Sequence, residues 1–168
     1  NTIAYNNIAG ISIVDAESDS NRWYWNRIYE NKSGITIPSN SKNTVTSLQF
    51  IGGIANVGVW GKAIAGSRVE LFSDEPGKIQ ASHIIGGTYA DAQGMWAISV
   101  PHLSEGQTLA ATQDSAMNSS LWSPRYIPQA AGNIHERDHG YRDIISLGSI
   151  KAFDSITVPL RFYAGGGS

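Results

Sequence analysis

The sequence contains no cysteine and few charged residues. Its 12 Lys and Arg against 14 Asp and Glu give a formal net charge of −2, and charged residues occupy only 15% of the 168 positions. Without cysteine, the chain forms neither a disulfide-stapled mini-scaffold nor a cysteine-ligated metal site. The nearly balanced charge offers no basic surface of the kind that binds nucleic acid. We therefore expect no nucleic-acid partner.

Long apolar runs are also missing. The longest, around residues 51–60, is interrupted by three glycines and is far shorter than the roughly 20 apolar residues that span a membrane. No basic segment followed by an apolar stretch opens the chain, which starts in mid-pattern at Asn1. We expect a fragment of a longer protein, without a transmembrane segment.

Small and polar residues are abundant instead. The chain has 18 glycines together with many Ser, Thr and Asn residues. This composition favours strands and turns, because it is poor in the Leu, Glu, Lys and Ala that stabilise helices. The sequence therefore predicts an all-β protein.

Two segments within the first forty residues match each other. Asn1–Ile13 recurs as Asn26–Ile37, with an offset of 25 positions in the first half and 24 in the second. A period in the low twenties, with short apolar alternations between Asn and Gly, is typical of solenoid coils built from short parallel strands. The expected inward rows pair Ile3 with Ile28, Ile11 with Ile35 and Ile13 with Ile37, and Ile11, Ile13, Ile35 and Ile37 are all expected to be buried in one stacked core. Gly10 and Gly34 would form tight corners, and Asn6 and Asn31 would stack as a ladder.

These segments resemble right-handed parallel β-helix repeat proteins, whose coils read N-x-I-x-x-N…G-I-x-I. The resemblance covers residues 1–45, or about two coils. A stack of two coils does not bury its own end. We expect earlier coils, another chain or a sandwich to cover Asn1–Ile13.

From Leu48 the pattern changes to short strands separated by turn signals, which is typical of a β-sandwich. The pieces, in chain order, are Ala65–Phe72, Asp91–Trp96, Leu103–Thr112 and Asp114–Ser120. Together they resemble a bacterial immunoglobulin-like family over residues 46–128, with Met95 and Met117 as departures from its pattern. The resemblance implies an immunoglobulin-like antiparallel sandwich, and we expect Trp60 and Trp96 in its core.

Residues 129–168 are expected to form a C-terminal extension. Ile156, Val158, Leu160 and Phe162 alternate within residues 155–163, and Pro159 restricts such a strand to the edge of a sheet. Upstream, residues 135–139 match the H-E-x-x-H pattern of zinc proteases. Gly132 and Gly140 flank the match and leave no helix long enough to place both histidines on one face. No catalytic residues are therefore expected, and the chain is predicted not to be an enzyme.

Four oxygen donors lie two positions apart in the first loop. They are Asp15, Glu17, Asp19 and Asn21. The spacing is that of a calcium loop, but Ser20 and Asn26 replace the Gly and Glu of an EF-hand. A solvated loop is the favoured interpretation and a calcium site is the alternative, and the sequence indicates no cofactor other than calcium.

An aromatic cluster follows this loop and contains Trp23, Trp25, Arg27 and Tyr29. If Ile28 points inward, Trp25, Arg27 and Tyr29 face outward. Such a row is suited to stacking sugar rings, or it is covered by the neighbouring sandwich. Because the sandwich is tethered nearby, we predict that at least one of the two tryptophans is buried against residues 46–168.

Taken together, these features predict a non-catalytic structural, spacing or adhesive module of a larger secreted or cell-surface bacterial protein. Its partners would be the other domains of the parent chain. One alternative is the C-terminal part of a β-helix carbohydrate-active enzyme, or a glycan-binding module. Another is a subunit of an extracellular fibre, in which the open coil end and the strand at residues 155–163 join neighbouring copies.

Overall fold

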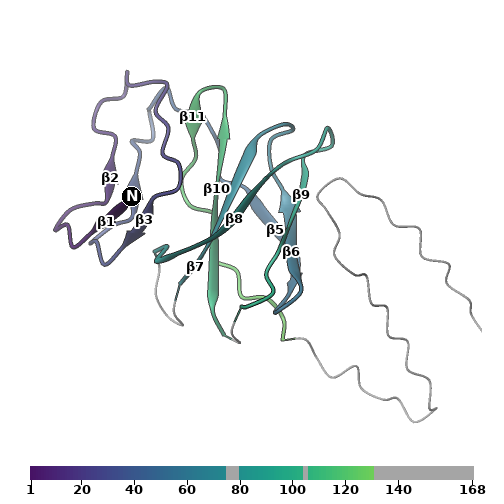
Figure 1. Cartoon of the computed structure of the whole chain (residues 1–168). Coiled ribbons are helices and arrows are strands. Elements are labelled where there is room, and N and C mark those ends of the chain that lie inside the picture. Colours follow the sequence, from purple (N-terminus) through teal and green to yellow (C-terminus); the bar gives the residue numbers. More distant parts are fainter. Residues whose placement is uncertain (75–79, 104–105, 131–168) are drawn as a thin grey trace, which may run out of the picture. The chain divides into compact units, whose positions relative to one another are not determined.

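The computed structural model describes residues 1–74, 80–103 and 106–130. None of these residues is helical, and the described part of the chain is all-β. In the same residues, no helix is long and apolar enough to cross a membrane. The strands are β1 (Thr2–Ala4), β2 (Ile11–Ser12), β3 (Arg27–Tyr29), β4 (Ile35–Thr36), β5 (Gln49–Ile54), β6 (Gly58–Lys62), β7 (Arg68–Asp74), β8 (His83–Tyr89), β9 (Met95–Ser99), β10 (Thr108–Ser115) and β11 (Asn118–Ser119) (Figure 1).

The chain divides into two compact units, Asn1–His135 and Glu136–Ser168. All described residues belong to the first unit. The H-E-x-x-H string and the strand expected at residues 155–163 lie outside the described residues. The boundary expected near residue 45 stays a prediction, because the residues on both sides of it fall within the same compact unit.

The first unit begins with two stacked coils, the first coil at residues 1–13 and the second at residues 26–37. Strand β1 pairs in parallel with β3, placing Ile3 opposite Ile28. Strand β2 pairs in parallel with β4, placing Ile11 opposite Ile35. The register predicted from the repeat is confirmed, including the change of offset between the two strand pairs. Gly10 is needed at the corner, since a Cβ there would lie 2.5 Å from Cγ2 of Ile28.

The burial predicted for the isoleucine rows is only partly correct. Ile28 and Ile35 are buried, at 1% and 8% exposure, and form one cluster with Trp23. Ile11, Ile13 and Ile37 pack against this cluster but are only partly buried, so their predicted full burial was wrong. In the first coil, side chains remain partly exposed because β1 and β2 each pair with a described strand on one side only.

Two antiparallel sheets follow the coils. Strands β11-β10-β7-β8 form one sheet and β5-β6-β9 form the other. Their inner faces share a core, to which the first sheet contributes Val69, Leu71 and Leu109 and the second contributes Val59 and Trp96. The packing of two sheets predicted from the strand spacing is therefore found, and Trp96 lies in the core as expected.

The expectation that Trp60 lies in the same core was wrong. Successive side chains of a strand point to opposite faces, and in β6 it is Val59 and Gly61 that face inward. The Trp96 ring occupies the space that Gly61 leaves, since a Cβ on Gly61 would lie 2.6 Å from Cζ2 of Trp96. Trp60 is consequently directed outward, where it is 38% exposed and lies against Gly52.

The coils lie against the outer face of the four-stranded sheet (Figure 1). Since Val69 and Leu71 of β7 face the core, Phe72 faces the other way. It is nevertheless only 2% exposed, because Trp122 packs edge-on against it with ring centroids 5.0 Å apart. Trp122 also packs against the coil cluster. The first unit therefore has three layers: coils, four-stranded sheet and three-stranded sheet.

Candidate functional site: the seam between coils and sandwich

The predicted asparagine ladder exists, and it continues into the sandwich. Asn31 Oδ1 accepts hydrogen bonds from the backbone N–H (3.0 Å) and Nδ2 (2.8 Å) of Asn6. Gln80 Oε1 in turn accepts hydrogen bonds from the backbone N–H (3.0 Å) and Nδ2 (3.2 Å) of Asn31. Gln80 Nε2 also donates to the carbonyl oxygen of Asn31. The side chain of Gln80 therefore occupies the next rung of the ladder.

The backbone of the second coil is paired at the same place. Ile28 N–H donates to the carbonyl of Ala81 (2.9 Å), and Ala81 N–H donates to the carbonyl of Ile28 (2.8 Å). Nearby, Trp122 packs so closely on Gly34 that a Cβ there would lie 2.7 Å from its Nε1. The second coil and the loop that precedes it contact the sandwich here. We call this contact the seam.

Trp23 is one of the residues buried at the seam. Its side chain is 7% exposed and belongs to the coil cluster, with Trp122 packed against that cluster. Its backbone N–H donates to Oγ of Ser119 (3.0 Å). Trp23 is therefore buried, as predicted for at least one of the two tryptophans, but its ring clusters with Ile28 and Ile35 of the second coil, and Trp122 is the residue of 46–168 that packs against this cluster. The indole Nε1 of Trp23 has no hydrogen-bond partner among the described residues.

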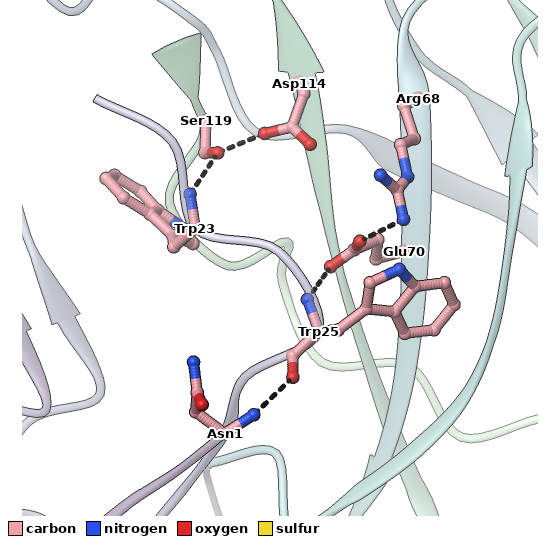
Figure 2. Close-up of polar contacts among 7 residues, drawn as sticks. All are labelled: Asn1, Trp23, Trp25, Arg68, Glu70, Asp114 and Ser119. Carbon is pink, nitrogen blue, oxygen red and sulfur yellow. Dashed lines mark hydrogen bonds and ion pairs between the residues drawn. The ribbon is translucent and has the colours of Figure 1, made fainter. Parts of the chain in front are cut away.

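Two carboxylates of the sandwich hold the loop that carries the tryptophans (Figure 2). Glu70 Oε2 accepts the backbone N–H of Trp25 (2.9 Å). Asp114 accepts a hydrogen bond from Oγ of Ser119, the hydroxyl that binds Trp23. Glu70 is 1% exposed and Asp114 is 8% exposed. Burial raises the pKa of both carboxyl groups, more than their hydrogen bonds and the nearby arginines lower it.

Arg68 is a cation that acts on both carboxylates. Its Nη2 lies 2.9 Å from Oε1 of Glu70, an ion pair without hydrogen-bond geometry. The guanidinium also lies over two rings, 4.7 Å from the centroid of Tyr24 and 5.2 Å from that of Trp25. Stacking of this kind suits the planar, weakly hydrated guanidinium. Arg68 therefore supports the loop through both its charge and its planar face.

The residues predicted to bind a glycan are divided between the interior and the surface. Trp23 is buried, so its ring is not available to a sugar. Trp25 is 40% exposed and has a left-handed backbone, with φ of 49°. The Arg27 guanidinium lies 5.4 Å from the Tyr29 ring centroid, and its Nε donates to the carbonyl of Ser82 (2.6 Å). The Tyr29 ring meets the ring of Tyr5 edge-on at 6.0 Å.

The residues predicted to bind calcium have other partners. Glu17 pairs with Lys42 at 2.5 Å. Asp19 Oδ1 accepts Nδ2 of Asn118 (2.6 Å), and this hydrogen bond is the main cause of a lowered Asp19 pKa. The remaining two have local or seam contacts: Asp15 Oδ1 accepts the N–H of Glu17, and the Asn21 N–H donates to Asn118. Within the described ranges, no three His, Cys, Asp or Glu side chains form a group that could hold a metal.

The sequence did not identify the residues of the sandwich that build the seam. Gln80, Glu70 and Ser119 contact residues 45 to 96 positions away, and their side chains are of ordinary polar types. The sequence did contain one sign that this face of the sandwich is covered. The outward row of β7 contains Phe72 as well as Glu70, and an apolar side chain between polar neighbours on an outer face indicates that the face is covered.

Comparison with known proteins identifies no family for this chain. Neither a protein-family model nor a curated protein sequence matches it significantly. One similar solved structure is described as "Biofilm associated protein - BSP domain"; the TM-score is 0.46 and the identity 17%, over 55% of this chain and 15% of that chain. The chain therefore spans only a small part of that protein, and a similarity this low assigns neither a family nor a function.

Proposed function

We propose that the first unit is a non-catalytic structural module of a larger secreted or cell-surface bacterial protein. In this module an immunoglobulin-like sandwich caps the final coils of a right-handed parallel β-helix. The observation that carries the proposal is the seam: Gln80 Oε1 accepts from Asn31 the two hydrogen bonds that Asn31 Oδ1 accepts from Asn6, and Ala81 pairs with Ile28 in an antiparallel bridge. A coil stack that ended at Asn31 would leave its backbone and ladder groups without partners.

Capping is the function that these contacts support best. An uncovered strand edge pairs with other chains, and natural proteins block such edges with a covering element. Here the covering element is a folded sandwich with its own core, so it also continues the structure beyond the last coil. The module would hold the coil stack and the following segment of the parent protein at a fixed distance.

Hydrogen exchange in the full chain tests the capping role. The double variant Gln80→Ala, Trp122→Ala removes the ladder rung and the ring that covers Gly34. We expect the amides of Ile11 and Ile13 to exchange at least about tenfold faster, while those of β6 and β9 keep their protection. Coils that keep their protection in this variant would be self-supporting, and capping would be excluded.

A second candidate, glycan binding, is favoured by the surface aromatic residues. Trp25 is held with a left-handed backbone by Glu70, and strained backbone of this kind is concentrated at functional sites. Tyr5 is 76% exposed beside Tyr29. A glycan array with the intact protein and with Trp25→Ala separates the two roles. Binding that is lost in the variant would establish a glycan site, whereas no binding to any glycan leaves the structural role.

A further inference from the structure

The outer edge of the first coil repeats the edge of the second coil on which it rests. The second coil offers Ile28, Asn31, Gly34 and Ile35 to the first coil. The first coil carries Ile3, Asn6, Gly10 and Ile11 at the equivalent positions. A surface that repeats another in sequence and in backbone conformation can make the same contacts.

Backbone groups along this edge are available for pairing. The N–H groups of Tyr5, Ile11 and Ile13 donate to the second coil. Because the N–H groups of alternate residues in a strand point to opposite sides, those of Ala4 and Ser12 point away from it. No described residue accepts them. The edge therefore presents a row of donors in the register of a parallel strand.

The ladder is open at the same end. Asn31 Oδ1 and Gln80 Oε1 each accept two hydrogen bonds from the ladder residue of the coil above. Asn6 Oδ1 accepts none from the described part of the chain. It is therefore positioned to accept the backbone N–H and Nδ2 of a further asparagine, one coil higher. The partner must therefore offer an asparagine whose backbone N–H and Nδ2 both reach Asn6 Oδ1.

A second copy of the protein does not meet this requirement. The side of a coil that would rest on Asn6 is the side that, in the second coil, already contacts Gln80 and Ala81. In the first coil, the same side rests on the second coil. Head-to-tail stacking of two copies would need the seam to open, and the fibre alternative is disfavoured for this edge.

We propose that the outer edge of the first coil binds a further coil of the same N-x-I-x-x-N…G-I-x-I repeat, joined ahead of Asn1 in a longer polypeptide. The proposal rests on the proposed function, in which the sandwich caps a stack of coils. The amino group of Asn1 is exposed and donates to the carbonyl of Trp25 (3.2 Å). A backbone N–H in its place can make the same bond, so a residue can precede Asn1 as Trp25 precedes Asn26.

The test is a chain in which residues 1–25 are duplicated ahead of Asn1. We expect the amides of Ala4 and Ser12 to exchange at least about tenfold more slowly by NMR, because they become bonded within the stack. A matched control carries Ile3→Asp and Ile11→Asp in the added copy only, and should give no protection. Asn6→Ala in the receiving coil should remove most of the protection.

Three results would overturn the proposal. One is unchanged exchange of Ala4 and Ser12 in the duplicated chain, whether or not the added segment folds. The second is equal protection by the Asp-containing control. The third is protection in the original chain at high concentration together with a dimer in sedimentation. Exchange of the Ile28 and Ala81 amides reports on the cap separately, so a failure of the proposed function would be recognised independently.

Discussion

At the scale of single residues, the seam depends on side chains of the sandwich that form hydrogen bonds with backbone groups of the second coil and its preceding loop. Gln80 ends the ladder by supplying one acceptor to two donors of Asn31 and one donor to its carbonyl. Both residues are buried, at 8% and 6% exposure. A buried polar group that loses its partner costs about 1–3 kcal/mol. The stability of the coils is therefore sensitive to individual polar contacts.

Gln80→Ala should lower the free energy of unfolding by about 1–3 kcal/mol, because the backbone N–H of Asn31 loses its acceptor and the Asn31 carbonyl loses its donor. The Nδ2 group of Asn31 keeps the carbonyls of Ile3 and Tyr29. Urea denaturation measures the change. Gln93→Ala is the control, since Gln93 is exposed and its replacement should change stability by less than about 0.5 kcal/mol. Equal effects of the two substitutions would contradict the role of Gln80.

Glu70 gives the seam a pH dependence. Its raised pKa means that the folded state binds the proton more tightly than the unfolded state, whose value is about 4.3. Between these two pKa values, the free energy of unfolding therefore falls as pH rises. Arg68, Asp114 and the N–H of Trp25 face the group. Arg68 and the N–H lower its pKa, and Asp114 acts with burial to raise it.

Glu70→Gln should reduce this slope, leaving the part that comes from Asp114, whose pKa is raised in the same direction. Denaturation curves from about pH 4 to pH 7 measure it. Glu17→Gln serves as the control, because Glu17 is an exposed carboxylate. A slope that is the same in Glu70→Gln as in the unmodified protein would show that Glu70 does not titrate in this window.

At the scale of elements, the sequence predicted most of the coil and sheet pattern. The match of Asn1–Ile13 to Asn26–Ile37 gave the correct parallel register, since a repeat fixes which residues stack. Asp91 and Gly94 are local turn signals, and Asp91 Oδ1 accepts two backbone N–H groups in the turn that follows β8. Trp60 was misplaced because its face depends on which residue of β6 packs against Trp96. The residues of β6 alone do not determine which of its two faces packs against Trp96.

Ile35→Ala should cost about 2–5 kcal/mol, as truncations of buried side chains do. Ile35 is 8% exposed and belongs to the small coil cluster. The exposed Ile8, at 77%, is the matched control, and Ile8→Ala should change stability by less than about 0.5 kcal/mol. Chemical denaturation measures both values. A cost below about 1 kcal/mol for Ile35→Ala would show that the coil core collapses around the cavity.

Gly61→Ala should destabilise the three-stranded sheet by about 1–3 kcal/mol or more, because the added methyl would overpack the core. Its Cβ would lie within 2.6 Å of the Trp96 ring and in collision with the carbonyl oxygen of Gln49. Gly86→Ala is the matched control, since its nearest neighbour would be 3.8 Å away. The melting temperatures compare the two variants, and a larger loss for Gly86→Ala would contradict the packing described for β6 and β9.

At the scale of the whole unit, the sequence predicted two kinds of architecture and a tryptophan buried where they meet, but not the polar residues that join them. The seam joins Trp23, Glu70 and Gln80 across long separations, and the pairing of polar side chains over such distances leaves no periodic signal. Its three-layer arrangement implies graded stability. The sandwich has its own core, the second coil has neighbours on both sides, and the first coil has a described neighbour on one side only.

Native-state hydrogen exchange should reveal this gradient. The amides of Ile11 and Ile13 should exchange fastest, those of Ile28 and Ala81 more slowly, and those shared by β6 and β9 slowest. The order follows from the number of layers that must separate before each group meets water. Uniform protection across the three groups would mean that the coils and the sandwich open only together.

The order of the ladder along the chain also affects how the protein is made. Synthesis delivers Asn6 first, Asn31 next and Gln80 last, so both coils leave the ribosome before their cap exists. At about 5–20 residues per second, the cap follows the second coil after several seconds. During that interval the strand edges of the nascent coils are uncovered. The coils are therefore expected to assemble in the direction opposite to translation, from the sandwich back towards the first residue.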